Sequence, residues 1–468
     1  MRILFVFPSA SSKYIFVDYH HGIGLLSALL KREGHQTSLL QVTDFNKRQI
    51  DQALDTFQPD VLAYSFMSDH KALAVEIMKY LAPRRIFSIA GGVHATLSPI
   101  ELINFVDCVC IGEGEDAILE VVQGKPLAEI PNLCYKNGDI RYNSVRPFLE
   151  DLDSLPFSDR EIFDYQKALD QDHRADFMAG RGCPFRCTYC INNQLYAIAD
   201  GPYVRWRSVD NVLAEIKQVL NNYKRIESIC FQDDTFALKK SWLEEFCSRY
   251  EKEIGLPFVC NLRVGSVNKE TAEILAAAGC IETRIGVEQG NETLRHNMLK
   301  RKMSNNEIVD TFAMIKKAGI KTFAYNMVGV PGETEETIQE TIALNRQLQP
   351  DKLHVSIFHP YPGTELYDQC IENGYLTENV TESYFEPVAS LSLPTISKDQ
   401  IEYYFRIFRT AVMYPKFLPL VKVLARIKIG RQKTLYDVGF QFAYRLFYVL
   451  QKLIPAFIRE PLFKLLKV

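Results

Sequence analysis

The sequence lacks the marks of a secreted or membrane-spanning chain. No apolar segment follows a basic start, so we expect no secretory signal. The longest charge-free apolar run, residues 86–100, is interrupted by two glycines, a histidine and a proline, and falls short of the ~18 to 20 residues that a spanning helix needs. Eleven cysteines in such a chain indicate free thiols or metal ligands rather than disulfides. We therefore predict a cytoplasmic protein.

The 468 residues, 47% of them hydrophobic, are enough for about three domains of ~150 residues each. The net charge of −3 is unevenly distributed along the chain. Residues 401–468 hold 13 Lys and Arg but only 3 Asp and Glu, a balance of +10, which leaves −13 for residues 1–400. We expect the two parts of the chain to meet different surroundings.

Residues 1–125 alternate apolar runs with segments of helical spacing. Continuous apolar runs are typical of parallel strands that are buried on both faces. The predicted strands are Ile3–Phe7, Thr37–Leu40, Val61–Ser65, Ile86–Ala90 and Asp107–Ile111. This alternation predicts a doubly wound, flavodoxin-like α/β domain.

Small or polar residues stand at the ends of three of these strands. They are His20–Gly24 after the first strand, Ser65–Met67 at the third and Gly91–His94 after the fourth. In an open α/β sheet, ligands bind at the carboxyl ends of the strands. The three segments therefore predict a ligand site, and tight turns without a ligand are the alternative interpretation.

An Asn137-Gly138 pair predicts a hairpin that closes the first domain, which we assign to residues 1–145. A polar linker with prolines follows at residues 146–172, and strands and helices alternate again over residues 173–375. Six such repeats in ~200 residues predict a partial, TIM-like (β/α)6 barrel, since a full eightfold barrel takes ~250. The predicted strands are Asp176–Ala179, Ser228–Gln232, Phe258–Leu262, Thr283–Val287, Thr322–Val328 and His354–Phe358.

The C-terminal region, residues 376–468, carries basic amphipathic helices. Apolar residues repeat at helical spacing, opposed by Lys and Arg. They are Phe417, Leu420, Val421 and Leu424 in one helix, and Phe442, Leu446, Val449, Leu450 and Leu453 in another. Such helices either pack on the barrel or lie on an anionic membrane surface. No recognition motif accompanies the charge, so we predict no nucleic-acid partner.

Three cysteines stand close together directly after the first barrel strand. Cys183, Cys187 and Cys190 have the spacing CxxxCxxC within a loop rich in glycine. A structural zinc site normally needs four ligands, and the chain has no second CxxC or HxxxH. A 4Fe-4S cluster with three protein ligands leaves one iron open for another molecule. The spacing favours the cluster over zinc or unligated thiols.

The CxxxCxxC motif, with the aromatic Tyr189 before its last cysteine, resembles the signature of the radical S-adenosylmethionine (SAM) superfamily. The resemblance implies that the three cysteines hold a 4Fe-4S cluster and that SAM chelates its open iron. It further implies that reduction of the cluster cleaves SAM to a 5′-deoxyadenosyl radical, with Tyr189 near the adenine.

Three later segments resemble SAM-binding segments of the same superfamily. The stretch Phe231–Phe236 stands where the family has Gly-Gly-Glu, which makes Asp233 and Asp234 candidates for the methionine ammonium group. Glu288 stands where an acidic residue binds the ribose. Gly329 belongs to a segment that resembles the loop after the fifth strand, although such a segment is also an ordinary turn into a helix.

The order of the two domains resembles the cobalamin-binding branch of the superfamily, which includes the anaerobic magnesium-protoporphyrin IX monomethyl ester cyclase. The resemblance implies a cobalamin site, whose residues would be His21, Gly24, Ser65, Gly91, Gly92 and Glu113. The family motif AspxHisxxGly is broken here, because Asp18-x-His20 is followed by Ile23, and His21-x-x-Gly24 is preceded by Tyr19. The domain therefore binds cobalamin without a protein imidazole on cobalt, or is vestigial.

The resemblance predicts a radical SAM enzyme that abstracts hydrogen from an unactivated carbon, followed by cobalamin-dependent methylation of a hydrophobic or lipid-like substrate. Hydroxylation or ring closure of the cyclase type is an alternative, and a non-catalytic iron-sulfur electron-relay protein is another. The expected partners are reduced flavodoxin or ferredoxin as electron donor and, through the basic helices, the inner face of the cell membrane. The sequence assigns no catalytic side chain.

Overall fold

The computed structural model describes residues 1–9, 19–376, 388–429 and 433–440. The chain divides into two compact units, each described by itself. The first comprises Met1–Leu262, Glu270–Ile281 and Pro360–Glu372, and the second comprises Arg263–Lys269, Glu282–His359 and Asn373–Val468. Within the described part of the chain, no helix has both the length and the apolarity to cross a membrane.

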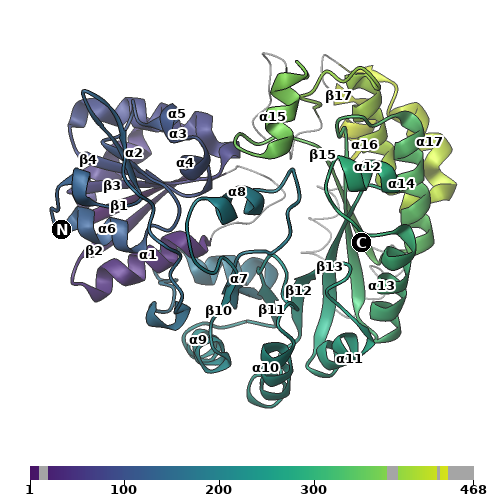
Figure 1. The fold of residues 1–468 in the computed structure, drawn as a ribbon, viewed down its shortest axis with the longest axis horizontal. Helices are drawn as coiled ribbons and strands as arrows, with labels where there is room; N and C mark the ends of the chain where they lie inside the picture. Colours follow the sequence, from purple (N-terminus) through teal and green to yellow (C-terminus); the bar gives the residue numbers. More distant parts are fainter. Residues whose placement is uncertain (10–18, 377–387, 430–432, 441–468) are drawn as a thin grey trace. The chain divides into compact units, whose positions relative to one another are not determined.

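The first unit begins with a seven-stranded sheet of order β2-β1-β3-β4-β5-β6-β7 (Figure 1). The first five strands pair in parallel, and β6 and β7 add antiparallel to the edge. The strands are β1 (Arg2–Pro8), β2 (Gln36–Val42), β3 (Val61–Ser65), β4 (Phe87–Gly91), β5 (Cys108–Cys110), β6 (Leu133–Asn137) and β7 (Asp139–Tyr142). The predicted doubly wound sheet is confirmed, as is the hairpin, whose turn residue Gly138 has φ +72°.

Helices cover both faces of this sheet, which explains why its central strands β1 and β3 are apolar and buried over nearly their whole length. On β1, Leu4 and Val6 belong to a core cluster with Ile50 and Ile77 of the helices on one face, while α1 and α6 contact each other. The helices are α1 (His21–Arg32), α2 (Lys47–Phe57), α3 (Lys71–Leu81), α4 (Val93–Leu97), α5 (Pro99–Leu102) and α6 (Glu115–Val122).

The rest of the first unit contains three parallel strands in the order β8-β11-β12, with helices between them in the sequence. A short antiparallel pair, β9 with β10, precedes and follows the cysteine loop. The elements are α7 (Tyr165–Asp172), β8 (Arg174–Phe177), β9 (Gly180–Arg181), α8 (Asn192–Ala197), β10 (Arg205–Trp206), α9 (Val209–Asn222), β11 (Ser228–Phe231), α10 (Lys240–Glu253), β12 (Phe258–Leu262), α11 (Lys269–Ala277) and α15 (Glu365–Glu372).

The second unit contains three further parallel strands in the order β13-β14-β15. Serine or threonine caps begin its long helices, and the side chains of Ser304, Thr334 and Ser397 each close a capping box. The elements are β13 (Cys280–Glu288), α12 (Glu292–Asn297), α13 (Asn305–Lys317), β14 (Lys321–Val328), α14 (Glu335–Leu348), β15 (Lys352–Ile357), α16 (Lys398–Met413), α17 (Leu418–Leu424), β16 (Lys428–Ile429) and β17 (Lys433–Thr434). All six predicted barrel strands are present.

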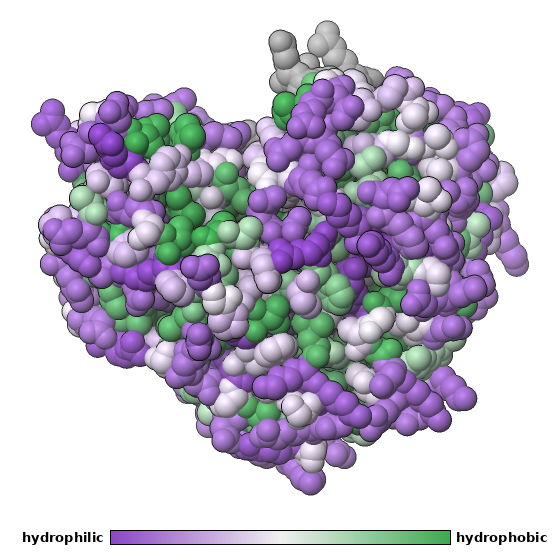
Figure 2. Space-filling model, in the orientation of Figure 1, coloured by the Kyte–Doolittle hydropathy of each residue, from purple (hydrophilic) through white to green (hydrophobic). Residues whose placement is uncertain are grey.

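The C-terminal region confirms one of the two predicted amphipathic helices. The first is α17 (Leu418–Leu424), and the second, predicted around Phe442–Leu453, lies outside the described residues. On the face drawn in Figure 2, hydrophilic side chains predominate and hydrophobic ones appear in patches between them.

Candidate functional site

A cavity of about 430 Å³ lies at the carboxyl-terminal edge of the first sheet, within the first unit. Two sets of residues line it. One set follows the strands of the first sheet and includes His21, Ser65, Gly91, Gly92 and Glu113. The other belongs to the cysteine loop and its neighbours and includes Gly180, Arg181, Gly182, Asn192 and Asp234. The cavity thus brings five of the six predicted cobalamin residues together with the cysteine loop.

Two glycines of the predicted cobalamin set have different structural roles. Gly92 has φ +89°, and a Cβ there would lie 3.2 Å from the Ser65 Oγ and 3.3 Å from the Phe66 carbonyl oxygen, so only glycine fits at this edge of the cavity. Gly24 does not line the cavity. Its carbonyl accepts a hydrogen bond from the Asp159 amide at 2.9 Å, and a Cβ there would collide with Ser158. Gly24 therefore lets the linker approach α1.

The two histidines at the start of α1 are both neutral at pH 7. His20 is the N-cap of the helix, because its Nδ1 accepts a hydrogen bond from the Ile23 amide at 3.2 Å, and burial lowers the pKa of His20 to about 4. His21 packs edge-on against Tyr19, with ring centroids 4.6 Å apart. Burial, assisted by the charge of Arg160, lowers the pKa of His21 to about 3. Within the described residues the buried Nε2 of His21 has no hydrogen-bond partner, which suits contact with a bound ligand.

Glu113, in the loop after β5, forms an ionic network with two arginines of the cysteine loop region. Its carboxylate accepts hydrogen bonds from Arg181 Nη1 at 2.7 Å, from Arg205 at 2.8 and 3.0 Å, and from the Leu149 amide at 3.0 Å. Arg181 also donates to Glu115 at 2.5 Å. Burial opposes ionisation, but the arginines lower the pKa of Glu113 to about 2. The network ties the ligand edge of the first sheet to β9.

Close backbone packing fixes the start of the cysteine loop. β9 and β10 pair through Arg181 with Arg205 and Gly180 with Trp206. A Cβ on Gly180 would lie 2.5 Å from the Arg205 carbonyl oxygen, and a Cβ on Gly182, whose φ is +86°, would collide with the Tyr203 backbone. The helix α9 begins shortly after β10, at Val209.

Two of the three loop cysteines differ from the other nine in exposure. None of the eleven cysteines forms a disulfide, and only Cys183 and Cys190 are not fully buried, while Cys187 is 5% exposed. Asn192 donates a hydrogen bond from its Nδ2 to the Cys190 Sγ at 3.6 Å, and the Tyr203 hydroxyl donates to the Asn192 Oδ1. Hydrogen bonds to sulfur ligands are a common feature of iron-sulfur sites.

The donor set suits a multi-iron cluster. Among the described residues, no three His, Cys, Asp or Glu side chains converge on a position for a single metal ion. A 4Fe-4S cluster does not require such convergence, because each thiolate binds a different iron. Three cysteines that form no disulfide, on a loop with a fixed backbone, therefore fit this group.

The two aspartates after β11 face different surroundings. The Asp233 carboxylate accepts hydrogen bonds from the amides of Ala179 at 3.0 Å and Gly180 at 2.7 Å, and burial raises the pKa of Asp233 to about 6. Asp233 thus holds the backbone that leads into the cysteine loop. Asp234 lines the cavity, and burial raises its pKa. Asp234 is therefore the better placed of the two to meet a cationic ligand.

Tyr189, the predicted adenine neighbour, does not line this cavity. It is half-buried in the turn between Cys187 and Cys190. The preceding residue, Thr188, accepts a hydrogen bond on its carbonyl from the Leu366 amide of α15 at 3.1 Å. α15 therefore supports the end of the cysteine loop.

The other two predicted SAM residues lie in the second unit. Glu288 ends β13 and Gly329 follows β14, and because these parallel strands are paired, both residues stand at one edge of the sheet. Glu288 has φ +66° at a β-bulge, and a Cβ on Gly286 would collide with its carboxylate. A side chain in this strained region is typical of functional positions.

A neutral carboxyl group supports this second edge. The Glu333 carboxyl accepts hydrogen bonds from the Gln289 Nε2 at 2.6 Å and from the Gly329 amide. Glu333 is fully buried among neutral hydrogen-bond donors, and burial raises its pKa to about 8. Its segment resembles a family loop in the sequence, but only the structure shows that Glu333 links the loops after β13 and β14.

Sequence reasoning missed several residues of the site. Arg181, Asn192 and Tyr203 line the cavity or support the cysteine loop. Arg181 and Arg205 are 68 and 92 residues from Glu113 along the chain. No short-range sequence pattern predicts these ion pairs. Only the acidic Gly112–Glu115 segment indicates that a charged partner is needed there.

Two family models match the chain on either side of this cavity. Residues 16–122 match the B12 binding domain, and residues 178–344 match the Radical SAM superfamily. The chain is a radical SAM enzyme with a B12-binding domain. Its cofactors are a 4Fe-4S cluster, SAM and cobalamin, and enzymes of this superfamily need a reductant.

Similar proteins include methyltransferases and a cyclase. An uncharacterised methyltransferase, PH0819, from Pyrococcus horikoshii is 27% identical over 84% of this chain and 88% of its own. The anaerobic magnesium-protoporphyrin IX monomethyl ester cyclase of Rubrivivax gelatinosus is 24% identical over 79% of this chain and 70% of its own.

A solved structure shares the fold of both domains. The radical SAM methyltransferase TsrM from Kitasatospora setae, with cobalamin and a [4Fe-4S] cluster bound, superposes with a TM-score of 0.65 at 16% identity, over 80% of this chain and 75% of its own. These comparisons confirm the predicted fold class, and both methyltransferases and a cyclase are among the proteins that resemble this chain.

Proposed function

We propose that this enzyme methylates an unactivated carbon of a hydrophobic or lipid-like substrate. The observation that carries the proposal is the shared cavity, whose walls combine the ligand edge of the first sheet with the cysteine loop. When bound, the cluster with SAM supplies a carbon-centred radical, and cobalamin supplies a transferable methyl group. A reaction that uses both cofactors needs them in one cavity, because the radical and the methyl group must reach the same substrate carbon.

We assign a separate set of residues to each cofactor. Cys183, Cys187 and Cys190 would hold the cluster, and Asp234 would bind the ammonium group of SAM. Glu288 and Gly329 would contribute further SAM contacts from the edge of the second unit. His21, Ser65, Gly91 and Gly92 would contact cobalamin.

The character of the cavity supports a hydrophobic substrate. Its polar residues lie mainly at the Glu113 network and the cysteine loop, and most of the remaining wall is apolar. The apolar side chains include Phe5, Leu25, Leu26, Tyr64, Ile89, Phe148, Leu152, Leu155, Leu195 and Ile198. Such a wall excludes water from a reactive radical and favours apolar ligands.

The test is anaerobic reconstitution of the full chain with iron, sulfide, cobalamin, SAM and a chemical reductant. If the three cysteines hold a cluster that cleaves SAM, the wild-type enzyme should form 5′-deoxyadenosine. We expect the Cys183→Ala variant to form none. Cys247→Ala, at a buried position in α10, is the matched control and should still form it. A wild-type protein that forms no 5′-deoxyadenosine with a loaded cluster would support the electron-relay alternative instead.

The likeness to the cyclase supports a second candidate, oxidative ring closure or hydroxylation. Product analysis separates the two reactions. Methyl transfer through cobalamin consumes a second SAM, so 5′-deoxyadenosine and S-adenosylhomocysteine should form in about equal amounts once substrate is supplied. Cyclisation or hydroxylation would give 5′-deoxyadenosine without matching S-adenosylhomocysteine. Extracts fractionated by polarity, from a strain that lacks the gene, provide the substrate pool.

We also propose reduced flavodoxin or ferredoxin as the electron donor, because the cluster must accept one electron at a low potential. Replacing the chemical reductant with either protein should sustain formation of 5′-deoxyadenosine. Formation that requires the chemical reductant in both cases would contradict this part of the proposal.

A further inference from the structure

The C-terminal part of the second unit exposes an unusual concentration of apolar side chains. Among the described residues, fifteen large hydrophobic side chains are exposed, and seven of them lie between residues 417 and 440. The most exposed are Phe417 (63%), Leu420 (59%) and Val423 (57%), with Ile427 and Ile429 at 44% each. We call these five residues the apolar row.

The apolar row has a common direction over most of its length. Phe417 is the N-cap of α17, and Leu420 and Val423 follow it within the helix at intervals of three residues, while Ile427 and Ile429 come after the helix ends. Residues three and four apart lie on one face of a helix. The row therefore forms a strip of apolar surface, of the kind that marks an interaction site when it is left uncovered.

The part of the sequence that carries this strip is rich in basic residues. Between Ala411 and Tyr436 the sequence contains no Asp or Glu. The exposed basic side chains of the same stretch are Lys416, Lys422, Arg426, Lys428 and Lys433. Long basic side chains can lay their stems along apolar surface while their charges reach an anionic layer.

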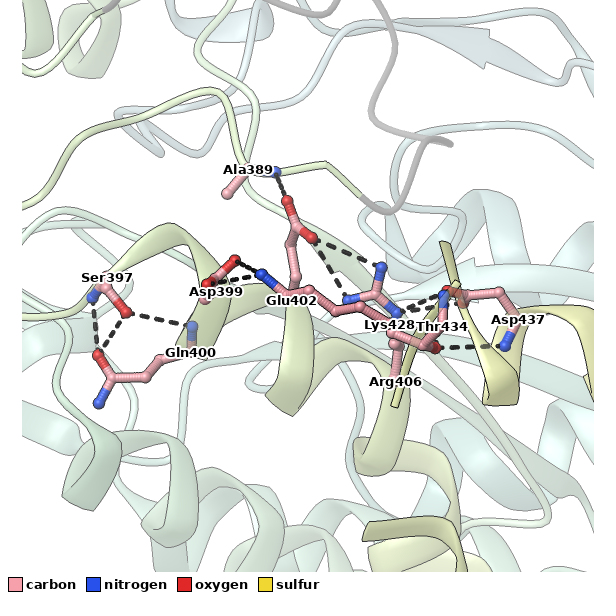
Figure 3. Close-up of polar contacts among 9 residues, drawn as sticks. All are labelled: Ala389, Ser397, Asp399, Gln400, Glu402, Arg406, Lys428, Thr434 and Asp437. Atoms are coloured by element: carbon pink, nitrogen blue, oxygen red, sulfur yellow. Dashed lines mark hydrogen bonds and ion pairs between the residues drawn. The ribbon is translucent and has the colours of Figure 1, made fainter. Parts of the chain in front are cut away.

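The segment that carries the strip is anchored to α16, as Figure 3 shows. Arg406 is 4% exposed, and its guanidinium pairs with Asp437 at 3.0 Å and with Glu402 at 3.4 Å. The Asp437 carboxylate in turn accepts hydrogen bonds from the amide and hydroxyl of Thr434, at 2.7 and 2.9 Å. This network fixes β17 and the first turn of the helix that follows it.

Further contacts fix the other end of the same segment. Lys428 pairs with Asp399 at 3.0 Å, as Figure 3 shows, and the Arg426 guanidinium lies 5.1 Å from the centre of the Tyr403 ring. α16 is itself built into the unit, because Arg346 of α14 donates to the Ala411 carbonyl at 2.8 Å. The apolar row is thus presented by an anchored element.

We propose that this face docks the enzyme on the surface of an anionic lipid membrane. An apolar row within a purely basic stretch is complementary to acyl chains beneath anionic headgroups. Two copies of this face would repel each other, and a nucleic acid would leave the apolar row uncovered. α17, with seven residues, is too short to cross a bilayer, so docking would be peripheral.

The test is co-sedimentation of the full chain with vesicles, and it does not depend on enzyme activity. We expect binding to phosphatidylcholine vesicles that contain phosphatidylglycerol, weaker binding at high salt, and little binding to phosphatidylcholine alone. The double variant Leu420→Asp/Val423→Asp should lower the bound fraction at least tenfold. Ile100→Asp is the matched control, because Ile100 is 59% exposed in the first domain, and it should bind as the wild type does.

Four outcomes would overturn the proposal. The first is equal binding to neutral and anionic vesicles, and the second is no binding to anionic vesicles. The third is that the double variant binds as the wild type does, whereas deletion of residues 441–468 abolishes binding. The last is a concentration-dependent dimer in gel filtration that the double variant dissociates, which would assign the face to a second copy. Circular dichroism and iron content check that the double variant folds, and both aspartates stand at exposed positions.

Discussion

Two glutamates at strand ends, one in each unit, show how differently a buried carboxyl group can be used. Glu113, in the first unit, is surrounded by Arg181 and Arg205, and its pKa falls to about 2. Glu333, in the second unit, receives hydrogen bonds only from neutral donors, and burial raises its pKa to about 8. Glu113 is ionised and holds two arginines, whereas Glu333 is neutral and links two loops through hydrogen bonds. Burial alone therefore does not determine the charge of such a group, and the partners decide.

The largest expected effect is that of Glu113→Gln. The substitution leaves Arg205, which is 5% exposed, without its counter-charge, and breaking a buried pair in this way costs about 3 kcal/mol. Glu333→Gln is the matched comparison and should change the free energy of unfolding by less than about 1 kcal/mol at pH 7, since the carboxyl group is already neutral. Urea unfolding followed by circular dichroism measures both. Equal losses would show that the two glutamates do not differ in charge.

Opposite pH dependences are the next largest effect. The folded-state pKa of Glu113 lies below its ordinary value of 4.5, so its contribution to stability is present above pH 4.5 and is lost as the pH falls towards 2. The folded-state pKa of Glu333 is raised, so stability falls as the pH rises from 4.5 to about 8. Each slope is at most about 1.4 kcal/mol per pH unit.

The two glutamine variants separate these slopes. Glu113→Gln should flatten the acid side of the profile of unfolding free energy against pH, and Glu333→Gln should flatten the side between pH 5 and 8. If a variant changes the unfolding free energy equally at every pH, the pH dependence does not come from the glutamate that was replaced.

Asp234 differs from both glutamates, because its carboxyl group has no arginine partner among the described residues and is not fully buried. We expect Asp234→Asn to raise the KM for SAM roughly tenfold, which corresponds to ~1.4 kcal/mol, because an amide cannot form a charge-assisted contact with an ammonium group. Formation of 5′-deoxyadenosine against SAM concentration measures it. Asp139→Asn, on the exposed β6–β7 hairpin, is the control. An unchanged KM would remove Asp234 from the SAM site.

The contrast between the two glutamates also shows which features the sequence could predict. Apolar runs such as Ile3–Phe7 and Val61–Ser65 predicted their strands because a parallel strand that is buried on both faces is apolar over most of its length. The cysteine motif predicted the loop because its spacing is local. Partners that are far apart in the chain, such as Glu113 and Arg205, leave no such pattern.

Adjacent residues of the same type were equally beyond prediction. Asp233 and Asp234 were interchangeable candidates in the sequence, and backbone geometry separates them, because the amides of Ala179 and Gly180 bind only Asp233. The strands β9 and β10 have two residues each, which is too short for any periodicity to show. Their pairing depends on the close approach of a glycine to a neighbouring backbone.

The smallest expected effect is that of a neutral network, and Tyr203→Phe tests it. The substitution removes the hydroxyl that holds Asn192, whose side chain donates to the Cys190 Sγ at 3.6 Å. A neutral hydrogen bond contributes about 1 kcal/mol, so cluster loading should persist and SAM cleavage should slow by only a few fold. The electron paramagnetic resonance spectrum of the reduced cluster should nevertheless shift, because hydrogen bonds to the sulfur ligands tune the cluster. Tyr142→Phe, at a side chain that is 52% exposed, should leave that spectrum unchanged. A spectrum that is identical in Tyr203→Phe and wild type would mean that Asn192 keeps its position without the tyrosine.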